Sequence, residues 1–70
     1  MDRKYIESSM IRSIGFDSES STLEIEFNSG AVWQYSDFPE SEWYQFESSE
    51  SKGKFFLSNI KGQYSEYQVG

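Results

Sequence analysis

The sequence predicts an α+β fold, in which two short helices at about 40–48 and 52–60 cover a three-stranded antiparallel meander at about 9–16, 22–28 and 31–36. Two observations carry this prediction. The stretch "TLEIEF" (22–27) alternates apolar and polar side chains, which is typical of a strand with one buried face. After Pro39 the period changes, and Trp43 and Phe46 lie three residues apart, as on one helix face. Strands followed by helices, without a repeat or a linker, favour one packed layer of each kind.

Local signals mark the ends of these elements. The first strand, in "MIRSIGFD", alternates imperfectly, and the turn-forming "DSESS" separates it from the second. Pro39 and the acidic residues after it favour the start of the first helix. Ser51 is the expected N-cap of the second helix, and Gly62 is its expected stop. The weak alternation of "QYSEYQV" favours a fourth, edge strand over 64–69.

The chain of 70 residues is short enough that a few large side chains must supply its core. A chain of this size buries only about 60% of its unfolded surface, and six phenylalanines, five tyrosines and two tryptophans meet that need. We expect residues 1–8 to be a flexible N-terminus and residues 9–70 to form a single domain. The predicted core consists of Ile14, Phe16, Leu23, Ile25, Phe27, Trp33, Tyr35, Trp43, Phe46, Phe56 and Ile60.

The loop before "AVWQYS" decides which face of the sheet Trp33 and Tyr35 occupy. A two-residue loop would place Gln34 in the core and both rings in solvent, where they could stack RNA bases. A three-residue loop, 28–30 with a left-handed Gly30, pairs Ile25 with Trp33 and makes one continuous apolar face. Burying Gln34 without partners costs about 1–3 kcal/mol, and exposing Trp33 loses burial energy of similar size. The three-residue loop is therefore favoured, with both rings on the core side.

Several function classes are excluded by absent residue types. The chain has no cysteine and no histidine, so disulfides, Ser–His or Cys–His catalysis and the usual zinc sites are not available. No metal or other cofactor is expected. No signal peptide and no membrane span are recognisable, so we expect a cytoplasmic protein with no membrane contact.

Charge is unevenly distributed along the chain. Residues 1–50 carry eleven acidic and three basic side chains, whereas residues 51–70 carry three lysines and one glutamate. In "SKGKFFLSNIKGQY" (51–64), a helix start with adjacent lysines could hold a phosphate, and Gly53 would let it approach. The alternative is that these lysines only line a solvated helix face. The candidate nucleic-acid or phosphate ligands are Ser51, Lys52, Gly53, Lys54, Phe55, Lys61 and Tyr64. Three lysines neutralise about three phosphates, so raising salt from about 50 to 200 mM should weaken binding roughly 20- to 40-fold.

The carboxylates favour no catalytic role. They fall in predicted turns, on the outward strand face and in exposed helix turns, which are positions of solvated surface charge. We therefore expect no enzyme activity. The acidic residues considered are Asp17, Glu19, Glu24, Glu26, Glu40, Glu42, Glu47 and Glu50.

Two sequence blocks in order resemble the KTSC domain family, a short module found at the C-terminus of some lysyl-tRNA synthetases and alone in bacterial proteins. The resemblance runs from about Ser9 to Val69. "IGFDSESSTLEIEFNSGAVWQYSDFP" is similar to the family's strand and hairpin block, and Trp33-Gln34-Tyr35 stands at its tyrosine-x-tyrosine motif with a tryptophan first. "SKGKFFLSNIKGQY" is similar to the family's second block. The family's function is not established, and the synthetase association suggests RNA binding.

Two function hypotheses follow, both non-catalytic. The first is a small module that binds RNA or phosphate groups through 51–64, with short RNA or an RNA–protein complex as partner. The alternative is a protein-interaction module that uses its acidic surface or an edge strand to meet a basic or β-strand partner. The net charge of −6 argues against long nucleic acids, so any RNA contact is expected to be short and local.

Overall fold

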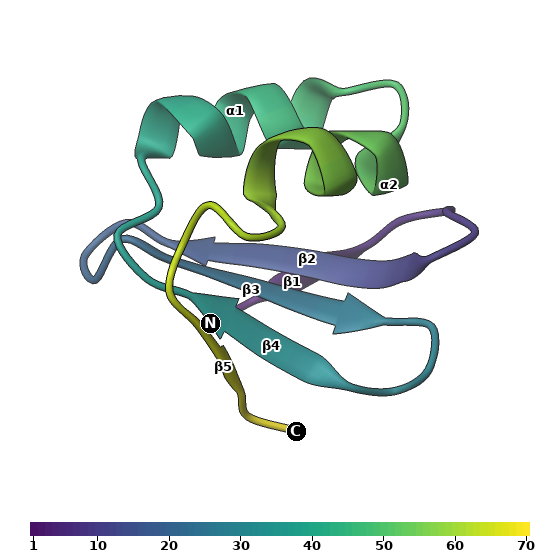
Figure 1. Ribbon diagram of the computed structural model, residues 1–70, viewed down its shortest axis with the longest axis horizontal. Coiled ribbons are helices and arrows are strands. Elements are labelled where there is room, and N and C mark those ends of the chain that lie inside the picture. Colours follow the sequence, from purple (N-terminus) through teal and green to yellow (C-terminus); the bar gives the residue numbers. More distant parts are fainter.

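The computed structural model describes residues 1–70 as a five-stranded antiparallel sheet with helices on one face (Figure 1). The strands lie in the order of the sequence: β1 (Arg3–Tyr5), β2 (Ile11–Asp17), β3 (Thr22–Phe27), β4 (Val32–Tyr35) and β5 (Glu66–Gln68). The helical segments α1 (Glu40–Ser48), α2 (Lys52–Phe55) and η1 (Phe56–Ile60) connect β4 to β5. The predicted α+β class is confirmed. The three predicted strands form the centre of the sheet, and one more strand flanks them at each edge: β5, where an edge strand was expected, and β1, which was not predicted.

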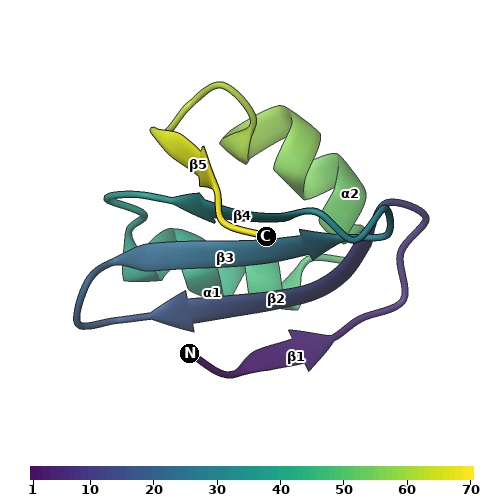
Figure 2. The same cartoon turned by 90° about the horizontal axis from the view of Figure 1, so that it is seen from below.

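The two edge strands differ in how well the sequence predicted them. β5 lies within the predicted edge segment 64–69. β1 lies in residues 1–8, for which no strand was predicted, and pairs with β2 so that Arg3 stands opposite Gly15. Figure 2 shows β1 and β5 at opposite edges of the sheet. The residues of β1 are polar or exposed, so no hydrophobic alternation signals the strand.

The register of β3 and β4 confirms the three-residue loop. Ile25 pairs with Trp33 and Leu23 pairs with Tyr35. The Phe27 amide donates to the carbonyl of Ala31 at 2.9 Å, which closes the loop, and Gly30 has the left-handed φ of 97°. Both rings therefore lie on the helix-covered face, and Tyr35 is fully buried. The alternative, in which these two rings form an exposed stacking platform, is wrong.

The core joins the sheet to the helices. Its nine buried apolar residues are Ile11, Ile14, Leu23, Ile25, Tyr35, Phe38, Phe46, Phe56 and Ile60. The sequence prediction missed Ile11 and Phe38. A bulge in β2 between Ile11 and Ser13 turns Ile11 inward, and a left-handed Asp37 (φ 55°) turns Phe38 under the helices.

Four predicted core residues are only partly buried. They pack against the rim of the core rather than inside it, and the rings of Phe16 and Trp43 stack on each other at 5.6 Å. These side chains therefore cover the core while part of their own surface stays exposed to water. These four are Phe16, Phe27, Trp33 and Trp43.

The helices begin and end where predicted, with one change in the second. α1 spans 40–48, as expected from the spacing, while the predicted helix at 52–60 is α2 continued by one π-helical turn. In that turn the Lys61 amide donates to the carbonyl of Phe56 at 2.9 Å, five residues back. The turn ends in Lys61 and leads through a left-handed Gly62 (φ 77°) toward β5.

Candidate functional site

The start of α2 has the predicted cap. The hydroxyl of Ser51 accepts a hydrogen bond from the Lys54 amide at 3.2 Å, as an N-cap serine does. Ser51 therefore uses its side chain to hold the helix start. Lys54, which follows on the same segment, is exposed to solvent.

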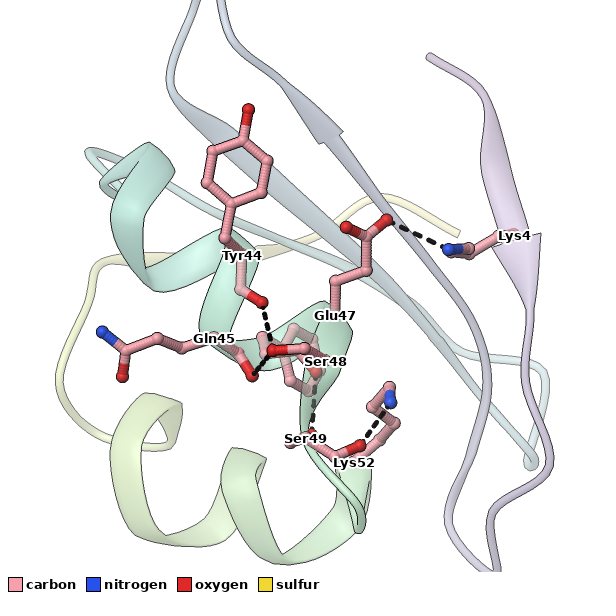
Figure 3. A network of polar contacts seen from close by, with 8 residues as sticks. Lys4, Tyr44, Gln45, Glu47, Ser48, Ser49 and Lys52 are labelled. Atoms are coloured by element: carbon pink, nitrogen blue, oxygen red, sulfur yellow. Dashed lines mark hydrogen bonds and ion pairs between the residues drawn. The ribbon is translucent and has the colours of Figure 1, made fainter.

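Lys52 points to α1 rather than outward. Its ammonium donates to the carbonyl of Ser49 at 2.6 Å, at the C-cap of α1 (Figure 3). The hydroxyls of Ser48 and Ser49 donate to the carbonyls of Tyr44 and Phe46 at 2.7 and 2.8 Å. The serine-rich segment and Lys52 thus satisfy the carbonyl end of α1, where a positive charge is favourable.

The other neighbours in the predicted site also pack inward. A Cβ placed on Gly53 would lie 3.6 Å from Met10 and Ser8, so this glycine faces the β1–β2 connection. The ring of Phe55 stacks on Phe46 with centroids 5.3 Å apart. Gly53 and Phe55 therefore help to seat the helix on the domain.

Tyr64 follows the same pattern. Its ring packs edge-on against Phe38 with centroids 4.9 Å apart. Burial and then the charge of Glu42 raise the pKa of the Tyr64 phenol. This ring packs against the core and is only partly exposed.

Lys54 and Lys61 form the part of the predicted site that faces solvent. Both side chains are exposed, and neither makes an ion pair or a side-chain hydrogen bond. Leu57, Ser58 and Asn59 are exposed between them, and Leu57 keeps 51% of its surface open. We call Lys54–Lys61, with its exposed side chains, the outer helix ridge. It presents two ammonium groups around a small apolar and polar surface.

The basic residues outside 51–64 are all paired. Arg3 contacts Glu24 at 3.4 Å, and Arg12 contacts Glu26 at 3.8 Å, both on the open face of the sheet. Lys4 contacts Glu47 of α1 at 3.0 Å on the covered face. The cations of the outer helix ridge are therefore the ones left free to meet an external anion.

The open sheet face carries two largely covered carboxylates and two exposed tyrosines. Glu24 accepts a hydrogen bond from the Gln34 amide at 2.9 Å, and Glu26 accepts one from Ser13 at 2.9 Å. Each of these carboxylates therefore has a hydrogen-bond donor and a cationic side chain as neighbours, and most of its surface is covered. Tyr5 and Tyr67 stand at the two edge strands with 78% and 57% of their surface exposed. Their signal in the sequence is weak, because each lies in a short strand without apolar alternation.

The surface shows no pocket, and no group of three or more acidic side chains is placed to hold a metal ion. None of the helices is long and apolar enough to span a bilayer.

Comparison with known proteins gives the family. A family model described as the KTSC domain matches residues 7–64. The chain belongs to the KTSC domain family. This confirms the resemblance predicted from the two sequence blocks, 14–39 and 51–64, and both blocks lie inside the match.

The relatives of this KTSC domain include both small proteins and parts of large ones. An uncharacterized protein from Stutzerimonas stutzeri is 36% identical over 67 residues, which are 96% of this chain and 94% of that protein. A lysine–tRNA ligase from Nostoc punctiforme is 35% identical over 63 residues, which are 90% of this chain and 11% of the ligase. The crystal structure of a KTSC domain protein from Yersinia pestis matches with a TM-score of 0.96 at 39% identity, over 99% of this chain and 97% of that one.

Proposed function

We propose that this KTSC domain is a non-catalytic module that binds the sugar–phosphate backbone of a short RNA segment through the outer helix ridge. One observation carries the proposal. Lys54 and Lys61 are exposed on one helical segment and have no partner in the protein, whereas the ammonium or guanidinium of every other basic residue is engaged. Phosphate contacts from such lysines position a protein on nucleic acid without reading its sequence.

The remaining candidate residues support the ridge from behind. Ser51 caps the helix, Lys52 ties it to the end of α1, and Gly53, Phe55 and Tyr64 pack it onto the domain. Because the nearby rings are used in this way, the proposed contact is to phosphate and ribose rather than by stacking of bases.

The relatives are consistent with an RNA partner. The Nostoc punctiforme relative is a lysine–tRNA ligase, and the matched region is a small part of it. An accessory module on such an enzyme is well placed to add a weak backbone contact to RNA that the rest of the enzyme recognises. The net charge of −6 limits this chain alone to a short and local contact.

The salt dependence of binding distinguishes the ridge from the full predicted patch. Two lysines neutralise about two phosphates, so raising salt from about 50 to 200 mM should weaken binding roughly 7- to 12-fold. Three free lysines would weaken it roughly 20- to 40-fold. The smaller factor is expected, because Lys52 donates to the carbonyl of Ser49.

A charge-matched pair of variants tests the proposal. Fluorescence anisotropy with a labelled RNA hairpin, at low salt, should show that Lys54→Gln with Lys61→Gln abolishes measurable binding. Ser18→Glu with Ser41→Glu changes the net charge by the same amount at exposed positions outside the ridge and should weaken binding only a few-fold. Equal losses in the two variants, or no wild-type binding at millimolar RNA, would contradict the proposal.

A further inference from the structure

The edge strand β1 is held in the sheet without a buried apolar side chain of its own. Its three residues bury no apolar side chain, since Arg3 is only partly covered and Lys4 and Tyr5 are exposed. The strand pairs with Ser13, Ile14 and Gly15 of β2, although β2 continues to Asp17. Charge and backbone pairing, rather than hydrophobic burial, therefore keep β1 in place.

Arg3 reaches across the sheet because Gly15 has no side chain. Gly15 stands between Arg3 and Glu24 in one cross-strand row. A Cβ on Gly15 would lie 2.7 Å from the carbonyl oxygen of Asp2 and 2.9 Å from Cγ of Arg3, closer than real contacts allow. The guanidinium passes over this gap to Glu24 at 3.4 Å, and the side chain of Glu24 is only 15% exposed.

Lys4 forms its ion pair on the opposite, helix-covered face of the sheet. It stands opposite Ile14, and its ammonium contacts the carboxylate of Glu47 in α1 at 3.0 Å (Figure 3). Two residues further along, Ile6 packs against the core, and its amide donates to the carbonyl of Arg12. Along the edge of β2, the segment 3–6 therefore places Arg3 on the open face of the sheet, Lys4 on the helix-covered face and Ile6 against the core.

We infer that the outer edge of β2 is a binding site for an extended basic segment of a partner protein, of the type Arg-Lys-x-aliphatic, which this chain fills with its own residues 3–6. The acceptor residues Gly15, Glu24 and Glu47 lie inside the KTSC match at 7–64, and β1 lies outside it. A partner strand that also pairs with Phe16 gains backbone hydrogen bonds that β1, which begins at Arg3, does not make. This site is separate from the outer helix ridge, and its occupant is a peptide rather than RNA.

The tethered strand competes with any partner. A short tether keeps β1 at an effective concentration of the order of millimolar, so a peptide of equal length should not displace it from the wild-type protein. Arg3→Glu with Lys4→Glu reverses both charges of β1 and leaves the acceptor residues unchanged. In that variant the amide chemical shifts of residues 4 and 5 should move to the values of an unstructured chain. The amide chemical shifts of the rest of the domain should stay unchanged.

A synthetic peptide with the sequence of residues 1–8 then tests the site in the full-length charge-reversed variant. We expect amide shifts at Ser13, Ile14, Gly15 and Glu47 that grow with millimolar peptide and weaken as salt is raised. A peptide with glutamate in place of its arginine and lysine should cause none. Replacing Glu24 and Glu47 by glutamine in the same variant should weaken binding by about 1.4- to 5-fold for each lost pair.

Gly15→Ala, combined with the charge reversal, should abolish the shifts, because its methyl group blocks the arginine position. The inference is contradicted if the released variant shows no shifts at millimolar peptide, or if the shifts fall away from the β2 edge. It is equally contradicted if β1 stays paired after its charges are reversed, since the ion pairs would then not hold it.

Discussion

The β1 edge and the outer helix ridge carry the same kind of charge and differ in what surrounds it. Arg3 and Lys4 project from opposite faces of a strand, and each meets a glutamate, Glu24 of β3 and Glu47 of α1. Lys54 and Lys61 project from a helical segment whose own residues include no acid. The difference shows that position in the fold, rather than the count of basic residues, decides which cations are available to an outside partner.

The helical segment depends on one inward ring. Phe56 packs edge-on against Phe27 and Tyr35, with centroids 5.3 and 5.9 Å apart, and its neighbour Leu57 points to solvent. Phe56→Ala should cost about 3–5 kcal/mol of unfolding free energy, whereas Leu57→Ala should change it by less than about 0.5 kcal/mol. Urea unfolding followed by tryptophan fluorescence measures both. Similar losses would mean that the ridge is not anchored through Phe56.

The paired and free cations should differ in their contribution to stability. Glu24→Ala removes the ion-pair partner of Arg3 and the hydrogen-bond acceptor of the Gln34 amide, so we expect a loss of about 1–2 kcal/mol. Lys61→Ala removes no contact and should stay within about 0.5 kcal/mol of wild type. Thermal unfolding at low salt compares the two variants. A Glu24→Ala variant as stable as the wild type would show that the paired and the free cations do not differ in their contribution to stability.

Two glycines give a smaller effect of opposite sign in the two regions. Gly53→Ala places a methyl group at ordinary contact distance inside a helix and should stabilise the protein by about 0.5–1 kcal/mol. Gly15→Ala forces the backbone of β1 away from β2 and should destabilise it. Hydrogen exchange should show the amides of Lys4 and Ile6, which face β2, losing protection in Gly15→Ala alone. If these amides stay protected in Gly15→Ala, the pairing of β1 with β2 does not require a glycine at position 15.

Local patterns predicted much of this fold. The loop 28–30 fixed the register of Trp33 and Tyr35, since one residue more or less would turn both rings to the other face. The bounds of α1 followed from proline, acidic residues and the spacing of two aromatic rings. The cap at Ser51 followed from its residue type and position.

Most of the missed features depend on contacts between segments that are distant in the sequence. β1 has no apolar alternation, and its partners Gly15, Glu24 and Glu47 are spread over the next forty-odd residues. Phe38 lies between Asp37 and Pro39 in a stretch that looks like a loop, and it is buried because a left-handed turn places it beside Tyr64. The contact of Lys52 is local instead: its side chain turns back three residues to the carbonyl of Ser49, and residue type alone does not fix that side-chain conformation.

We propose that the unpaired lysines of the outer helix ridge, and not the paired cations of the sheet, meet RNA. Amide chemical-shift mapping of the wild-type protein with a short RNA hairpin at low salt tests it most directly. We expect salt-sensitive shifts confined to residues 54–61, with Arg3, Arg12 and the exposed tyrosines of the edge strands unchanged. Shifts centred on Tyr5, Tyr67 and the arginines of the open sheet face would contradict the claim.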